Sequence, residues 1–145
     1  MTWRGRWAMV AWLLALPGCG SGALEPQPVP LDHAECASCR MLISRVDDAA
    51  QAVAPGDEPR FYDDRGCLAK DVALLPSGAR LFVQLDGGAG WTDVDHAFFA
   101  FPANARTPMG YGVTAFRTDA AASNADRGGR ALKWADVIRE VDNHD

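Results

Sequence analysis

The first nineteen residues limit what the rest of the chain can fold into. Arg4 and Arg6 give a positively charged start, residues 7–16 form an unbroken apolar run, and small residues then lead to Cys19. Basic, then apolar, then small is the order found in a secretory signal. The apolar run is well short of the roughly 20 residues that a membrane-spanning helix needs. We therefore expect residues 1–18 to be a cleaved leader and the rest of the chain to be exported.

The cysteine at the cleavage point resembles the lipobox of bacterial lipoproteins, in which that thiol is lipidated and becomes the new N-terminus. The resemblance implies lipidation at Cys19 and a protein anchored at the periplasmic face of the cell envelope. Gly20 follows the cysteine, and no Asp does, which is compatible with sorting to the outer membrane. Pro17 stands where the motif usually has Ala, Ser or Thr. The alternative is an ordinary signal peptide with an incidental cysteine.

Removal of the leader makes the protein more acidic. The whole chain has 14 Lys and Arg against 19 Asp and Glu, a net charge of -5. The leader holds two arginines and no acid, which leaves 12 basic against 19 acidic residues and a net charge of -7. Such a protein is a poor partner for nucleic acid or for an anionic membrane surface. Residues 19–32 are expected to be a lipidated flexible tether, and residues 33–145 a single domain with one modest core.

The apolar and capping patterns of residues 33–145 predict two units with the same order of elements. The predicted strands cover residues 41–46, 60–62, 81–85, 97–101, 113–117 and 131–132. The predicted helices run from a cap at Asp63 or Asp64 to about Leu75, from Asp119 to about Gly128, and from Trp134 to Val141. Each half therefore reads strand, strand, helix, strand. We expect an α+β domain in which two similar ββαβ-like units share one core.

Three cysteines remain once Cys19 carries a lipid, namely Cys36, Cys39 and Cys67. An odd number of thiols in an oxidising compartment cannot pair fully within one chain. Disulfide bonds alone therefore do not account for all three thiols, and the odd number favours a metal-binding or redox role.

The chemistry concentrates in the segment Cys36-Ala37-Ser38-Cys39-Arg40-Met41. A C-x-x-C pair serves zinc sites, redox enzymes and copper chaperones alike. If Cys39 begins a strand, its sulfur and that of Met41 point to the same side. A thiolate beside a thioether is a soft donor pair, which suits Cu(I) better than Zn(II). The alternative is that Met41 only fills the core.

Further candidate ligands lie outside this segment. Cys67 falls in the first turn of a predicted helix, where the helix dipole favours a thiolate, although a lone cysteine is also a common small buried hydrophobe. Met109 lies in the glycine-containing loop 107–112, and His33 is close enough to the motif to complete a low-coordinate site. His96 and His144 are expected to be surface or structural histidines.

Three ordered motifs resemble those of the NosL-type nitrous oxide reductase accessory lipoproteins, over about His33 to Trp134. The family's C-x-x-C-G-M matches Cys36, Cys39 and Met41, its F-D-D-x-G-C resembles residues 61–67, and its M-G-x-G-x-x-A-F matches residues 109–116. Two departures are clear. Arg40 replaces the usual Gly, and Tyr62 inserts one residue between Phe61 and the aspartates.

The resemblance implies Cu(I) binding by the cysteine–methionine motif and delivery of copper to nitrous oxide reductase, or to another copper enzyme, during assembly of its copper centres. It also implies a fold of two ββαβ-like units. We expect Cys39 and Met41 to be the main ligands and Cys36 to be the next. Cys67, Met109 and His33 are supplementary candidates, and a homodimer that shares an ion is compatible with the same motifs.

Two other functions remain open. Cys36 and Cys39 could form a dithiol–disulfide oxidoreductase, although such motifs usually open a helix, or the three cysteines and His33 could hold a structural zinc ion. No Ser-His-Asp order or phosphate-binding loop stands out. The pairs 47–48 and 63–64 are expected to be solvated turns or helix caps rather than acid–base pairs. We therefore expect a metal-binding protein and not an enzyme.

Overall fold

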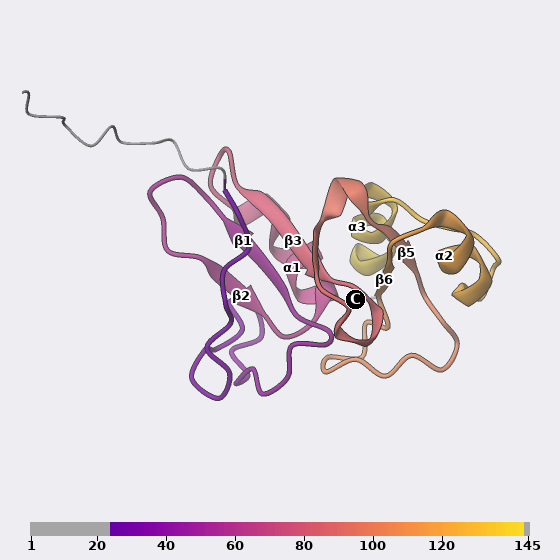
Figure 1. The fold of residues 1–145 in the computed structure, drawn as a ribbon, viewed down its shortest axis with the longest axis horizontal. Coiled ribbons are helices and arrows are strands. Elements are labelled where there is room, and N and C mark those ends of the chain that lie inside the picture. The colour runs from indigo at the N-terminus through magenta and orange to yellow at the C-terminus, as the bar shows by residue number, and fades with distance from the viewer. Residues whose placement is uncertain (1–23, 144–145) are drawn as a thin grey trace, which may run out of the picture.

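The computed structural model describes residues 24–143 and confirms the predicted α+β class (Figure 1). A four-stranded antiparallel sheet and a two-stranded antiparallel sheet lie beside three α-helices. Within residues 24–143, no helix is both long and apolar enough to cross a membrane.

The first unit contains the four-stranded sheet. Its elements are β1 (Ala50–Val53), β2 (Arg60–Tyr62), α1 (Arg65–Asp71), β3 (Arg80–Gln84) and β4 (Trp91–Asp93). The strand order is β2-β1-β3-β4, so the first strand lies between the second and the third. A 3₁₀ turn over Val72–Leu74 continues α1, which brings the helical segment to its predicted end near Leu75.

The second unit repeats this arrangement around a smaller sheet. Its elements are β5 (Phe98–Ala100), β6 (Thr114–Phe116), α2 (Asp119–Ala125) and α3 (Trp134–Asp142). β5 pairs with β6 on one side, and Phe99 forms an antiparallel bridge with Leu132 on the other. The first strand of each unit is therefore central. α1 contacts β1 and β2, just as α2 contacts β5 and β6.

The predicted strand over residues 41–46 is wrong. That stretch contributes a single bridge, from Leu42 to Glu35, and the first strand of the sheet is instead the Ala-Gln-Ala-Val run of β1. All four of its residues are buried, including Gln51. Alanine and glutamine have little strand propensity, and a buried glutamine breaks the apolar pattern, so the strand gave no signal.

The expected tether is held against the fold from Leu24 onward. Gln27 donates its backbone N–H to Gln51 Oε1 over 2.7 Å, and Gln51 Nε2 donates to the Gln27 carbonyl over 3.0 Å. Arg80 Nη1 donates to the Leu24 carbonyl over 2.9 Å, and Val29 packs against the core. The expectation of a flexible tether is therefore wrong for residues 24–29, which are held against the domain.

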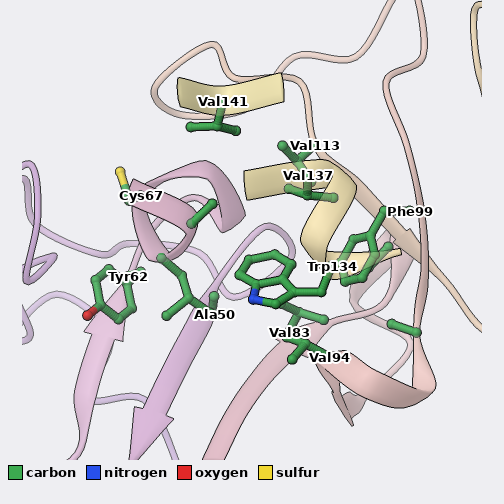
Figure 2. Packing of buried hydrophobic residues seen from close by; sticks show 14 of the residues in the cluster. Ala50, Tyr62, Cys67, Val83, Val94, Phe99, Val113, Trp134, Val137 and Val141 are labelled. Atoms are coloured by element: carbon green, nitrogen blue, oxygen red, sulfur yellow. The ribbon is translucent and has the colours of Figure 1, made fainter. Parts of the chain in front are cut away.

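One hydrophobic core joins the two units (Figure 2). Val83 of β3 lies beside Trp134 of α3, whose ring packs on Phe99 of β5 with centroids 5.3 Å apart. α1 also packs against α3, so each unit supplies one wall of the core. Cys67 lies on α1, at the edge of the cluster away from Trp134 (Figure 2).

A buried guanidinium links the two units beneath this core. The Arg65 side chain is fully buried, and its Nε and Nη2 donate to the Gln84 carbonyl over 2.9 and 2.7 Å. Nη1 donates to Asp48 Oδ1 and to the Val113 carbonyl, each over 3.0 Å, and Nη2 also donates to the Asp47 carbonyl over 2.7 Å. One side chain thereby satisfies three backbone carbonyls.

Replacement of Arg65 by Met is expected to lower the free energy of unfolding by about 3–5 kcal/mol, because it leaves buried carbonyls and a carboxylate without their donor. Arg139→Met is the matched control, because Arg139 forms an ion pair with Asp136 at the surface and its loss is expected to cost less than about 1 kcal/mol. Urea unfolding followed by circular dichroism measures both. Equal effects of the two substitutions would contradict the structural role of Arg65.

Candidate metal centre

The C-x-x-C segment forms a tight loop at the start of the fold. The Cys36 N–H donates to the Met41 carbonyl over 2.8 Å, and the Arg40 N–H donates to the Cys36 carbonyl over 3.0 Å. The Ala37 N–H donates to the Phe61 carbonyl over 2.8 Å, which fastens the loop to β2. Cys39 therefore lies in a turn and does not begin a strand. The prediction that Cys39 and Met41 point to the same side of a strand is therefore wrong.

Arg40 adopts a backbone conformation that favours glycine. Its φ is 67°, in the left-handed region that L-residues visit at a cost. Glycine would adopt this conformation without strain. The Arg40 side chain forms an ion pair with Glu35 over 2.7 Å, and both groups are largely exposed.

The second half of the centre comes from the start of α1. β2 ends at Tyr62, Asp64 caps the helix by accepting from the Gly66 N–H, and Cys67 is the third helical residue. The predicted cap at Asp64 and the first-turn position of Cys67 are confirmed. The pair 63–64 was expected to be a solvated turn or a helix cap. Asp64 is the cap, and neither residue is solvated, because Asp63 and Asp64 are buried at 5% and 0% exposure.

Four side chains meet where the loop touches the helix. One ligand atom from each of Cys36, Cys39, Asp63 and Cys67 lies within 4.8 Å of all the others, and this group could hold a metal ion. All three cysteines are free thiols. Two sulfurs that bind one ion at about 2.3 Å can lie at most about 4.6 Å apart, so a small adjustment lets all three sulfurs bind one ion.

Burial divides the cluster into an inner and an outer part. Cys36 and Cys67 are buried, at 0% and 1% exposure, whereas Cys39 is partly exposed. The Cys39 thiol lies 3.4 Å from Asp63 Oδ1, to which it donates. An ion in this cluster would therefore be surrounded by Cys36, Cys67 and Asp63 inside the protein and by Cys39 at its surface.

The three thiols differ in their tendency to ionise. A hydrogen bond from the Cys67 thiol lowers the pKa of Cys36 to about 6. Burial raises the pKa of Cys39 to about 11, and the same hydrogen bond to Cys36 together with burial raises the pKa of Cys67. Cys36 is therefore the most easily ionised of the three, while the raised pKa values of Cys39 and Cys67 oppose loss of their protons, which a metal ion would have to displace.

Asp64 fastens the loop that carries Met109 to the same helix start. Its Oδ2 accepts from Thr107 Oγ1 over 2.6 Å and from the Met109 N–H over 3.0 Å. Gly66 adds to this contact, because a Cβ there would come within 2.2 Å of the Tyr111 ring. The second and third motifs of the sequence are therefore neighbours in space.

Both candidate methionines are exposed. Met41 is 54% exposed and Met109 is 39% exposed, so the alternative that Met41 fills the core is wrong. Met41 lines an open hollow of about 210 Å³ whose wall also contains Asp63 and Pro108. The hollow therefore reaches the four-residue cluster at Asp63, with a thioether at its wall.

The candidate ligand His33 does not join the cluster. His33 is exposed and lies outside the group of four, in which Asp63 supplies the donor that His33 was expected to supply. His96 is exposed, and His144 lies outside the described residues. Only a weak sequence signal pointed to Asp63, its position next to the helix cap Asp64 and near Cys67, because Asp63 lies before the helix and its side-chain direction does not follow helical spacing.

Comparison of this chain with protein families, with curated proteins and with solved structures found no match.

The left-handed backbone at residue 40 predicts which substitutions stabilise the protein. Both Arg40→Gly and Arg40→Ala remove the exposed ion pair, but only glycine adopts the left-handed conformation without strain, so we expect the glycine variant to be about 1 kcal/mol more stable. Arg45 is nearby and does not have a positive φ. There we expect the alanine variant to have a free energy of unfolding about 0.4–1 kcal/mol higher than that of the glycine variant. Urea unfolding of the four variants tests this, and the same ranking at both positions would contradict it.

Metal binding is expected to release protons. Below their raised pKa values, Cys39 and Cys67 must each lose a proton to bind, so the apparent affinity should rise about 100-fold per pH unit between pH 7 and 9. Cys39→Ser should reduce this to about tenfold, because only Cys67 then titrates. Competition titrations with Zn²⁺ or Cu(I) at several pH values measure the slope. An affinity independent of pH would show that these two thiols are not ligands.

Proposed function

We propose that this protein is an exported, lipid-anchored Cu(I) carrier of the NosL type. It binds copper at the cysteine cluster and delivers it for assembly of the copper centres of nitrous oxide reductase or of another copper enzyme. The observation that carries the proposal is the convergence of the sulfurs of Cys36, Cys39 and Cys67, all free, with one of them partly exposed.

The donor set favours Cu(I) as the cargo. Thiolate and thioether ligands select Cu(I), and Met41 lies exposed at the hollow that leads to the cluster. The division between buried and accessible sulfurs supports delivery of the copper ion to an acceptor rather than its permanent storage. Cys36 and Cys67 retain the ion inside the protein, while Cys39 and Met41 are the ligands that an acceptor can reach and replace.

Zinc is the second candidate cargo, and Asp63 is the observation that favours it. Three cysteines and one carboxylate offer four donors, the number that a structural zinc site uses, and zinc accepts carboxylate oxygen. The choice between the two ions depends on whether Asp63 or Met41 contributes to binding.

The dithiol–disulfide oxidoreductase is disfavoured by the position of Cys36. In such enzymes an accessible thiolate attacks the substrate. Here the thiol with the lowered pKa is fully buried, and the exposed thiol has a pKa raised to about 11. The C-x-x-C segment also forms a turn that no helix follows.

Anaerobic titration of the reduced protein with Cu(I), against a chromophoric chelator, tests the proposal. Cys39→Ser and Cys36→Ser are each expected to lower the Cu(I) affinity by about 100-fold or more, because each removes a ligand. Met41→Leu keeps the volume and removes the thioether, and about a tenfold loss is expected. Leu42→Ala is the matched control at an equally exposed neighbouring residue.

Asp63→Asn separates the two ions in a parallel titration with Zn²⁺. A copper carrier keeps its Cu(I) affinity in Asp63→Asn and shows the loss of about tenfold in Met41→Leu. The reverse result, with loss of Zn²⁺ affinity in Asp63→Asn and no effect of Met41→Leu, would replace copper with zinc. Wild-type protein that fails to compete for either ion would refute both cargoes.

A further inference from the structure

The segment before the domain is a stiff strap rather than a free linker. Proline occupies every second position at Pro26, Pro28 and Pro30, and proline-rich segments are extended and semi-rigid. The intervening Gln27 makes two hydrogen bonds with the buried Gln51 side chain, and Val29 packs on the core. We refer to residues 24–30 as the strap.

The strap runs from one end of the four-stranded sheet to the other. Leu24 is held by Arg80, which pairs with Val53 at the end of β1. Further along, the Pro30 carbonyl accepts from the Ala34 N–H at the start of the cysteine loop. In Figure 1 the described chain begins at the upper end of the sheet, and the loops that follow the strap lie at the lower end.

The cysteine cluster lies at the end opposite to Leu24. β1 pairs Ala50 with Tyr62 at one end and Val53 with Arg80 at the other, a separation of three residues or about 10 Å. Asp63 follows Tyr62 and belongs to the cluster, whereas Arg80 holds Leu24. The sheet therefore separates the start of the strap from the metal centre.

Only a short stretch of chain separates Leu24 from the proposed lipid anchor. Five peptide units join Cys19 to Leu24, and a chain of this length reaches at most about 18 Å when fully extended. An anchor at Cys19 thus keeps the Val53–Arg80 end of the sheet close to the lipid headgroups.

We infer that the strap turns the Val53–Arg80 end of the sheet toward the membrane and the cysteine cluster toward the aqueous space. This inference rests on the lipid anchor of the proposed function. Gln51 and Arg80 act as positioning residues that hold the strap along the sheet. The protein that accepts the metal ion accordingly docks on the end of the domain that faces away from the bilayer, where the cysteine cluster lies.

Photo-crosslinking of the full-length acylated protein in vesicles of phosphatidylethanolamine and phosphatidylglycerol tests the orientation. A benzophenone amino acid is placed at Ser77, in the exposed turn before β3, or at Ser44, in the exposed wall of the hollow. We expect at least about fivefold more lipid adduct at Ser77 than at Ser44. Insertion of a long Gly-Ser linker between Ala23 and Leu24 leaves the fold unchanged and should abolish the difference.

The outcomes separate the orientation from the anchor. Vesicle binding by the acylated chain with equal adducts at both positions would overturn the orientation and leave the anchor intact. A difference that persists with the inserted linker would overturn the role of the strap, because the domain surface itself would then orient the protein. Failure of the chain to bind vesicles when Cys19 is present, with Cys19→Ala as the control, would overturn the anchor and the inference together.

Discussion

The structure depends on the buried guanidinium of Arg65. Its five donors meet the carbonyls of Gln84 and Val113, which belong to different units, and the turn at Asp47 and Asp48. A charge in this position is tolerated because its partners surround it, and removal of any partner group is costly for the same reason. Since Arg65 is also the first residue of α1, these bonds fix the helix start relative to both sheets.

The metal centre follows from that fixed helix start. Asp63, Asp64, Gly66 and Cys67 flank Arg65, and each makes a separate contact. Asp63 and Cys67 face the C-x-x-C loop, Asp64 holds the Met109 loop, and Gly66 lets Tyr111 approach the backbone. The C-x-x-C loop and the loop 107–112 therefore converge on the start of α1, because this short helix start presents different groups to each of them.

The sequence predicted the fold class, the order of the two units and most elements, because helix caps and apolar patterns are local signals. It missed β1, whose Ala-Gln-Ala-Val sequence shows no strand pattern until the buried Gln51 is matched with the backbone of Gln27. It also missed the burial of Asp63. A carboxylate next to a helix cap looks like a solvated one when its partner, Cys39, is 24 residues away. Both errors arose because the deciding contacts join residues far apart in the sequence, which local patterns do not reveal.

The conformation of the C-x-x-C loop shows why the motif alone could not decide the chemistry. In a redox enzyme the same spacing opens a helix whose amide groups stabilise an accessible thiolate. Here the loop turns back on itself through Arg40, whose left-handed backbone returns the chain to the Glu35–Leu42 bridge. This turn buries Cys36 beside Cys67 and leaves Cys39 at the surface. Arg40 therefore holds the loop in a left-handed conformation at the cost of backbone strain that a glycine would not carry.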